Sequence, residues 1–545
     1  MMSSNFLNRF ALCVASGLAL GMAFPKFDFA LLAWVAMVPL FYAIEGETLG
    51  RVFGWAFLAG FASFATSMYW IVVPLHDFAD VRLEFALMPM LLLAAVMALF
   101  SGFAIWIGAA TARRLRISIA ITMPIAWAAV ELLRTYFPIG FPWNLLGYTA
   151  YQHLELIQFA EFTGVYGVSA LIVFFNTVVY LVLLRRGGAR AQATSLSVLT
   201  GLMIAILGFG AWRLADLQSR QPAGTIRAAM VQADIPQSLK WDPSFLPQSF
   251  KIYQDETTAI AKRGADLIVW PEAAAAFYFQ PDDRYPPEFA SDDAYRAALL
   301  ALARSTGVPI LFGAPALAER DGRMGFYNRA YLVSAKGDVV AHYDKMQLVP
   351  FGEYVPFRPI LGFIVRRVVP GLDSMFAGTE QTLFPLGHAK LGVLICYESI
   401  FPDLTRREVK AGAEVLVNIT NDAWYGKSSA PYQTLAMAAM RSAETKVPMI
   451  RAANTGITAV IKPSGEITER TPIFERGTEI GVVEWRRVRT FYTIVGDLFA
   501  ELCFLLTVLA LLAAWLYPRK LKPLAALAEK LATQNGHSRA SSNHE

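Results

Sequence analysis

The sequence predicts an α/β domain inserted between the transmembrane helices of an eight-helix membrane bundle. Of the 545 residues, 55% are hydrophobic and only 17% are charged, and the mean hydropathy is +0.42. This composition is too apolar for an ordinary soluble protein and indicates a polytopic membrane protein. The length still leaves room for a separate folded domain beside the helices.

Eight apolar runs approach the roughly 17–25 residues that a helix needs to cross a bilayer. They cover residues 9–24, 28–44, 52–73, 85–110, 117–134, 163–184, 195–213 and 493–516. The first two are short, and we expect them to be tilted or paired as a hairpin. The first also resembles a signal peptide, because Arg9 precedes an apolar core and small residues lie near Ala23. We favour an uncleaved helix.

Clusters of positive residues orient this predicted bundle. They follow the fourth, sixth and last runs, as Arg113, Arg114 and Arg116, then Arg185, Arg186 and Arg190, then Arg519, Lys520 and Lys522. Placing all three clusters in the cytoplasm satisfies the positive-inside rule with a single alternation of the spans. Both termini are then cytoplasmic, and the segment 214–492 faces the outer side of the membrane.

The chain therefore divides into four predicted parts. Residues 1–213 form a bundle of about seven helices, 214–492 an outer domain, 493–516 a last span and 517–545 a cytoplasmic tail. The outer part alternates β-rich runs with helical stretches, which is typical of α/β layers. Its strand candidates are IRAAMVQADI, ADLIVW, VPILFGAP, YNRAYLVS, VVAHYDKM, KLGVLICY, EVLVNIT, TGITAVI and EIGVVEW. Its helices are expected over 245–263, 291–306, 402–411 and 430–445.

Three predicted strands of the outer part deliver an ionisable residue where they end. LIVWPEAA carries Glu272, HYDKMQLVPFGEYVPF carries Lys345, and LICYES carries Cys396. Strand ends and the loops after them are where α/β proteins place chemistry. Taken alone, Lys345 is better explained as a surface lysine and Cys396 as an inert core thiol, and Glu272 fits a solvated acid as well as a catalytic one.

Taken together, the three residues supply complementary chemical roles. A base can deprotonate a thiol, and a cation can stabilise the oxyanion that the thiolate then creates. A carboxylate in a partly apolar pocket is expected to have a raised pKa, which would suit Glu272 as the base. Cys13 and Cys503 lie inside apolar runs and are expected to be inert. Neither the cysteines nor the histidines have the spacing of a metal site, so no metal is predicted.

The order of VWPE, DKMQLVPFGEY and LICYE resembles the nitrilase, or carbon–nitrogen hydrolase, superfamily over residues 225–485. The surrounding spans, with VQADIPQSLKWD, GFPWNLLGY and NDAWYG, resemble the apolipoprotein N-acyltransferases of the bacterial inner membrane. This resemblance implies a nitrilase-like α-β-β-α sandwich in which Glu272 is the general base, Lys345 the oxyanion-stabilising cation and Cys396 the nucleophile. Supporting or substrate-binding positions are Glu353, Tyr397, Glu398, Trp241, Asn328 and Trp424.

The resemblance also implies a reaction and its partners. The thiolate takes a fatty acyl chain from the sn-1 position of a phospholipid, and the resulting thioester passes it to a lipoprotein. The acceptor is the α-amino group of the N-terminal diacylglyceryl-cysteine of an apolipoprotein, in the last step of bacterial lipoprotein maturation. The expected partners are these two substrates and the lipid of the inner membrane. Neither a cofactor nor a nucleic acid is expected.

Several alternatives remain open from the sequence. A membrane-tethered amidase or nitrilase that hydrolyses a small amide would share the three residues. A transporter or receptor would need ionisable residues inside its spans, and the candidates are few: Glu131, Arg134, Glu155 and Glu161. Tyr397 and Asn328 are also explained by core hydrogen bonds, and Trp241 by packing or by anchoring at the membrane interface. Trp424 is interpreted as part of a loop that gates a lipid pocket.

Overall fold

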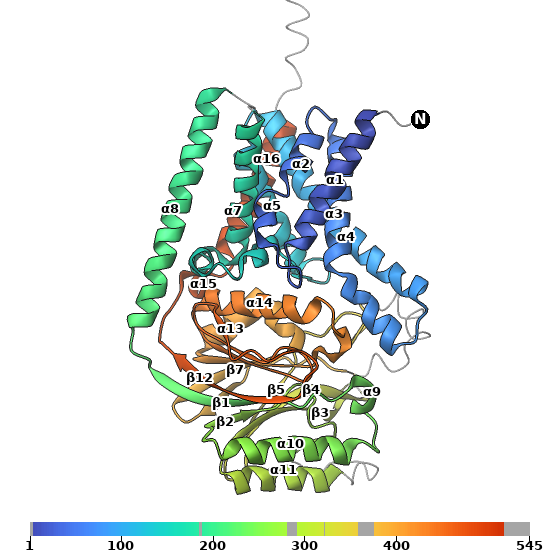
Figure 1. Cartoon of the computed structure of the whole chain (residues 1–545), viewed down its shortest axis with the longest axis vertical. Coiled ribbons are helices and arrows are strands. Elements are labelled where there is room, and N and C mark those ends of the chain that lie inside the picture. The colour runs from blue at the N-terminus through green and yellow to red at the C-terminus, as the bar shows by residue number, and fades with distance from the viewer. Residues whose placement is uncertain (1–3, 185–187, 281–291, 321, 358–374, 517–545) are drawn as a thin grey trace, which may run out of the picture.

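The computed structural model describes residues 4–184, 188–280, 292–320, 322–357 and 375–516. A bundle of long helices forms one half of the molecule, and two stacked sheets with flanking helices form the other (Figure 1). The chain enters the sheet half from α8 (Ala189–Ser219) and returns to the bundle through α15 (Phe491–Val495) and α16 (Leu498–Leu516). The predicted insertion of an α/β domain between membrane helices is therefore confirmed.

Six helices in the described part of the chain are long and apolar enough to cross a membrane. They are α1 (Ser4–Met22), α3 (Leu49–Ser67), α4 (Leu83–Leu115), α7 (Ala160–Leu183), α8 (Ala189–Ser219) and α16 (Leu498–Leu516). A further helix, α5 (Ile119–Tyr136), packs among α4, α7 and α16. In contrast, α8 stands at the side of the bundle (Figure 1). The chain is thus a multi-pass membrane protein.

The predicted span over 28–44 differs from the structure, which breaks it into two short pieces. These are a 3-10 turn, η1 (Ala30–Trp34), and α2 (Val38–Ala43), with Pro39 in the first turn of α2. Proline has no backbone N–H and a fixed φ, so it favours the start of a helix over its interior. Asn176 of α7 pairs with both sides of the break, since it accepts from Met37 N and donates to Ala33 O.

The outer domain contains two six-stranded sheets within the described residues. The first runs β12-β1-β2-β3-β4-β5, with bounds Gly477–Trp485, Gly224–Gln232, Leu267–Val269, Ile310–Arg320, Arg323–Val333 and Val339–Asp344. The second runs β11-β10-β9-β8-β7-β6, with bounds Ile467–Thr468, Ala459–Ile461, Met449–Ala453, Val415–Thr420, Ala389–Ile395 and Leu383–Leu386. Each sheet has a parallel centre, β1-β2-β3 in one and β7-β8-β9 in the other.

Helices cover the two outer faces of the stacked sheets. Helices α10 (Leu246–Ala261) and α11 (Asp292–Thr306) lie on the face far from the bundle, and α13 (Pro402–Ala411) and α14 (Ala430–Thr445) lie on the face toward it (Figure 1). The buried apolar residues between the sheets include Val269, Leu391 and Val417. This arrangement confirms the predicted α-β-β-α sandwich.

Helix α14 joins the outer domain to the bundle through buried polar contacts. Glu444 Oε1 accepts from Val165 N at 2.8 Å, directly after Gly164, whose φ of +61° interrupts α7. Gln433 accepts from Trp143 Nε1 at 2.7 Å and donates to Ser67 O at 2.8 Å. The sheets are therefore held in a fixed position against the bundle.

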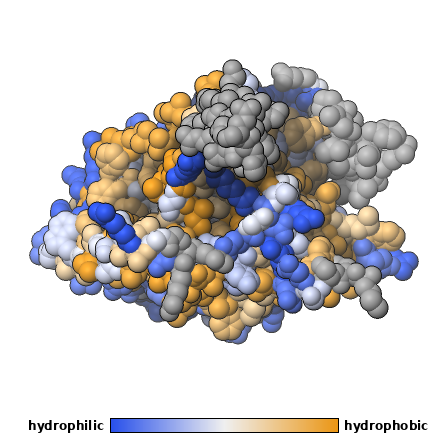
Figure 2. Space-filling model, turned by 90° about the horizontal axis from the view of Figure 1, so that it is seen from above, coloured by the Kyte–Doolittle hydropathy of each residue, from blue (hydrophilic) through white to orange (hydrophobic). Residues whose placement is uncertain are grey.

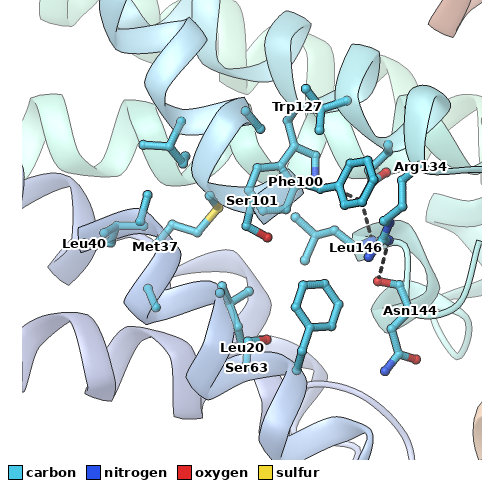
Figure 3. Close-up of a pocket in the computed structure, with 18 of the residues that line it drawn as sticks. Leu20, Met37, Leu40, Ser63, Phe100, Ser101, Trp127, Arg134, Asn144 and Leu146 are labelled. Carbon is cyan, nitrogen blue, oxygen red and sulfur yellow. Dashed lines mark hydrogen bonds between the residues drawn. The ribbon is translucent and has the colours of Figure 1, made fainter. Parts of the chain in front are cut away.

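Two ionisable residues inside α5 hold the loop that carries GFPWNLLGY. Glu131 Oε1 accepts from Leu146 N at 2.8 Å, and an Arg134 N–H donates to Asn144 O at 3.2 Å. Both side chains are buried and line a cavity of about 40 Å³ among α1, α3, α4 and α5 (Figure 3). These contacts explain why the two charged residues are buried: they anchor the loop. The two residues therefore do not support the hypothesis that the protein is a transporter.

Candidate active site

Glu272 lies just beyond the carboxyl end of β2, after Trp270 and Pro271. Its side chain is buried; Oε1 accepts from Asn328 Nδ2 at 2.7 Å and Oε2 from Asn421 N at 2.9 Å. Gly313 on β3 permits this position, because a Cβ there would lie 2.9 Å from Glu272 Cα. Asn328 is thereby placed in direct contact with the candidate base, as its predicted supporting role requires.

Lys345 follows β5 and has no exposed side-chain surface. Its ammonium lies 3.4 Å from Glu272 Oε1 and 2.6 Å from Glu353 Oε1. The other oxygen of Glu353 accepts from Val349 N at 2.8 Å, which fixes the loop after Lys345. The lysine is therefore held between two carboxylates.

Cys396 follows β7 and begins a 3-10 turn, η6 (Cys396–Ile400). Its φ is +52°, a left-handed conformation that costs energy in a residue other than glycine and that recurs at functional sites. The sharp turn directs the chain away from the sheet at this residue, which as a whole is partly exposed. Cys396 is thus presented at a strained strand end, in the manner of a nucleophile elbow.

Glu398 connects the cysteine turn with the lysine loop. Its Oε2 accepts from Ile395 N at 2.7 Å, and its Oε1 accepts from Met346 N at 2.7 Å and Gln347 N at 3.0 Å. The Tyr343 hydroxyl also donates to it, at 2.8 Å. Glu398 is fully buried, so it positions both loops from below and does not face a substrate.

The electrostatics keep the proton on sulfur at rest. Burial and, to a lesser degree, the charge of Glu272 raise the pKa of Cys396 to about 12, and Lys345 opposes both. Burial also acts to raise the pKa of Glu272, but Lys345, the Asn328 hydrogen bond, Lys240 and a hydrogen bond from Cys396 together bring it below its ordinary value. The predicted raised pKa of Glu272 is therefore wrong, because the neighbouring cations outweigh its burial. The site pairs a neutral thiol with an ionised carboxylate.

Tyr397 packs into an aromatic group that includes residues of the bundle. Its ring contacts Phe401 at 4.9 Å and, at 6.5 Å each, Phe141 and Trp143 from the GFPWNLLGY loop. Its hydroxyl is buried and has no hydrogen-bond partner among the described residues. The residue next to the cysteine therefore meets the membrane half directly.

The two predicted tryptophans lie at the surface. Trp241 is 51% exposed, at the end of α9 (Gln237–Lys240), outside the buried cluster of Glu272 and Lys345. Trp424 is 43% exposed, and its ring lies 5.5 Å from that of Phe78, in the turn after α3. Trp424 thus bridges the outer domain and a bundle loop, and a gating role for it stays a prediction.

Sequence reasoning missed Lys240, the neighbour of Trp241. Lys240 is buried, and its ammonium donates to the backbone oxygen of Glu272 at 2.9 Å. The signal lay in QSLKW, where an amphipathic turn can direct only one of two adjacent side chains inward. Whether the lysine or the tryptophan side chain points inward depends on the geometry of α9, which the sequence alone does not determine.

A buried polar network beneath Cys396 was also missed. Asn418 Nδ2 donates to Leu394 O at 3.0 Å and to Cys396 O at 3.4 Å, and its side-chain oxygen accepts from Arg451. Arg451 also pairs with Asp422 at 2.9 Å. The network supports the strained turn from the neighbouring strands β8 and β9.

Two family models match long stretches of this chain. Family models described as "Carbon-nitrogen hydrolase" and "Apolipoprotein N-acyltransferase N-terminal domain" match residues 227–491 and 16–178. An amidase from Nesterenkonia sp. of solved structure is 22% identical, covering 51% of this chain and 94% of its own, with a TM-score of 0.37.

Curated relatives match over nearly the full length. The chain is 37% identical over 500 residues to an apolipoprotein N-acyltransferase of Geobacter metallireducens, with 91% of this chain and 93% of the relative covered. It is 32% identical to that of Methylococcus capsulatus, with 89% and 92% covered. With nine-tenths of both chains aligned and both family models matched, this membrane protein belongs to the apolipoprotein N-acyltransferase family.

Proposed function

We propose that this protein transfers a fatty acyl chain from the sn-1 position of a phospholipid to the N-terminal diacylglyceryl-cysteine of apolipoproteins. The observation that carries the proposal is the buried cluster of Glu272, Lys345 and the turn of Cys396, set against aromatic residues of a membrane bundle. A soluble hydrolase would not need this contact with the bundle. Membership of the family supports the same assignment.

In the first half-reaction, Glu272 removes the proton from the Cys396 thiol as sulfur attacks the ester carbonyl. The new sulfur–carbon bond creates an oxyanion, which Lys345 stabilises. The ester carbon–oxygen bond then breaks, and Glu272 returns its proton to the departing lysophospholipid oxygen. Cys396 is left carrying the acyl chain as a thioester, and Glu272 is again ionised.

In the second half-reaction, the neutral α-amino group of the apolipoprotein attacks the thioester. A nitrogen–carbon bond forms, the carbon–sulfur bond breaks, and the proton released by the amine passes through Glu272 to the sulfur. We also propose that the Tyr397 hydroxyl hydrogen-bonds a substrate, since it is buried and has no partner in the described chain. The cycle is complete with the residues named and is a ping-pong covalent mechanism.

The contact with the bundle gives the reaction a physical advantage. Each methylene of an acyl chain contributes about 0.8 kcal/mol to membrane binding, so extracting a whole chain into water is costly. A nucleophile beside the bundle reaches the ester while the chain stays in lipid. We also propose that the apolar loop after Lys345 contacts lipid: Phe351 and Phe357 are half-exposed, Val355 is buried, and Ile360, Leu361, Phe363 and Ile364 lie outside the described residues.

The charge distribution supports a periplasmic outer domain in the bacterial inner membrane. Hydrophilic residues gather at the end of the bundle far from the sheets (Figure 2). Arg9, Arg51 and Arg113 meet there, around Glu47. By the positive-inside rule this end is cytoplasmic, which puts both termini inside and the sheets outside. We therefore keep the proposed division into a bundle over 1–213, an outer domain over 214–492, a last span over 493–516 and a cytoplasmic tail over 517–545, although α8 continues to Ser219.

An isotopic transfer assay tests the proposal. The purified protein is mixed with a phospholipid labelled only in its sn-1 chain and with a synthetic peptide that begins with diacylglyceryl-cysteine. We expect labelled N-acyl peptide and one equivalent of lysophospholipid, and neither product with the Cys396→Ala protein. Label released as free fatty acid without acylated peptide would identify water as the acceptor and would contradict the proposal.

A further inference from the structure

Lys240 brings a second buried ammonium to the candidate site. It ends α9 and is 3% exposed, and among the described residues its ammonium donates a hydrogen bond to Glu272 O at 2.9 Å. An ammonium group can donate three hydrogen bonds, so this contact does not by itself explain why a charge is buried here. Burying an ammonium costs several kcal/mol unless nearby charges compensate for it.

The ionised groups around Glu272 balance only when Lys240 is included. Lys345 and Glu353 lie 2.6 Å apart and form a neutral pair. Glu272 then remains as an uncompensated negative charge, and Lys240 is the cation bonded to its backbone. Lys240 interacts electrostatically with both Glu272 and Cys396.

We infer that Lys240 is a positioning residue that holds Glu272 in its ionised form and stabilises the Cys396 thiolate when the proton has moved. This inference rests on the proposed function and adds a second cation to its mechanism. The buried cluster remains neutral before and after proton transfer, since the negative charge only moves from Glu272 to the sulfur.

The other charged groups near the site do not replace Lys240. Asp422 faces Cys396 and is paired with Arg451 at 2.9 Å. Glu398 lies below the cysteine turn, and burial raises its pKa to about 7 despite its backbone hydrogen bonds. Burial lowers the pKa of Lys240 to about 8, with Glu272 and Cys396 opposing that change, so Lys240 is mainly protonated at pH 7.

Three substitutions in the full-length protein separate charge from hydrogen bonding. Lys240→Met removes both, Lys240→Gln keeps an N–H donor without the charge, and Lys240→Arg keeps both. Lys251→Met on α10 is the matched control, because Lys251 is a largely exposed lysine that pairs with Asp255. A thermal unfolding transition like that of the wild-type protein establishes that each variant is folded.

The first readout is alkylation of Cys396 by iodoacetamide at pH 7, located by peptide mass spectrometry. It requires no lipid or lipoprotein substrate, so it remains informative even if the proposed function fails. We expect roughly tenfold slower alkylation in the Met and Gln variants, since one nearby charge shifts an ionisation by about one pKa unit or more. The Arg variant and the Lys251 control stay within a few-fold of wild type.

The second readout is the pH profile of thioester formation from phospholipid. Without the charge of Lys240 the Glu272 carboxylate is harder to maintain, so the acid limb moves to higher pH by about one unit in the Met and Gln variants. Suppose that the Gln variant has the acid limb of the wild-type pH profile and the wild-type alkylation rate. This result would overturn the inference, because a hydrogen bond without a charge would then be enough for the function of Lys240. An equal loss of alkylation rate in the Arg and Gln variants would overturn the inference as well, because the charge would then be irrelevant.

Discussion

Glu353 Oε1 lies 2.6 Å from the Lys345 ammonium, closer than any other carboxylate oxygen that the structure describes around this lysine. Glu272 is the more distant partner, at 3.4 Å. The short ion pair keeps Lys345 charged, since the two carboxylates raise its pKa against the effect of burial. It also prevents Lys345 from pairing fully with Glu272, which has to remain free to accept a proton.

Glu353→Gln should slow acylation more than it disturbs the fold. Without its nearer partner, Lys345 moves closer to Glu272 and further lowers the basicity of that carboxylate. We expect thioester formation to fall by roughly 10- to 100-fold, measured by the rate of acyl-enzyme appearance. Glu319→Gln, on an exposed part of β3, is the control and should have the wild-type rate. An unchanged rate in Glu353→Gln would contradict this division of roles.

Glu408 should make stability depend on pH. Burial raises its pKa from 4.5 to about 7, with the Glu398 charge adding to the rise, and Gln381 and Arg407 opposing it. The folded state therefore binds more protons than the unfolded state between these values, so stability falls as pH rises through this window. Glu408→Gln should be about 1–3 kcal/mol more stable than wild type at pH 8 and nearly equal at pH 5. Paired unfolding curves at the two pH values measure this, and a difference that is larger at pH 5 would contradict it.

Arg451 should be required for the stability of the cysteine turn. Arg451 and Asp422 are both buried and lie 2.9 Å apart. Arg451→Met leaves the Asp422 charge without its partner, so we expect a loss of about 3–5 kcal/mol. Adding Asp422→Asn should recover part of that loss, since no isolated charge then remains. Thermal unfolding of the single and double variants tests this, and a double variant less stable than Arg451→Met alone would contradict it.

Glu131 should affect acyl transfer through the loop it holds. Glu131→Leu leaves Leu146 N without its acceptor and loosens the loop that places Trp143 against Tyr397. We expect transfer to fall by about tenfold, because small displacements of positioning groups are costly in rate. Alkylation of Cys396 by iodoacetamide should remain at the wild-type rate.

Ser101→Ala is the matched control for Glu131→Leu. Ser101 lines the same cavity from α4 (Figure 3). This variant should leave both rates unchanged. A parallel fall of transfer and alkylation in Glu131→Leu would instead show damage that extends to the nucleophile itself.

Several helices of the outer domain could be predicted from the sequence because their residue patterns are unambiguous. Helices predicted over 402–411 and 430–445 have those bounds in the structure. In contrast, β9 (Met449–Ala453) was missed, since Arg451 interrupts its apolar run. That arginine is buried only because β8 and η7 (Asp422–Tyr425) supply Asn418 and Asp422, which are distant partners that no local pattern reveals.

The convergence of Glu272, Lys345 and Cys396 came from resemblance and not from spacing. Each residue stands at the end of its own strand, and the two stacked sheets bring those ends together. The sign of the Glu272 pKa shift and the inward orientation of Lys240 depend on the same three-dimensional arrangement. The sequence therefore led to the wrong sign for the Glu272 pKa shift and did not reveal that Lys240 points inward.

The central claim is that Cys396 carries the acyl chain. Intact-protein mass spectrometry after incubation with phospholipid alone tests it most directly, because the thioester accumulates when the amine acceptor is withheld. We expect a mass gain of one acyl group on the wild-type protein, removed by hydroxylamine, and no gain on the Cys396→Ala protein. A hydroxylamine-sensitive acyl gain that persists in Cys396→Ala would contradict it.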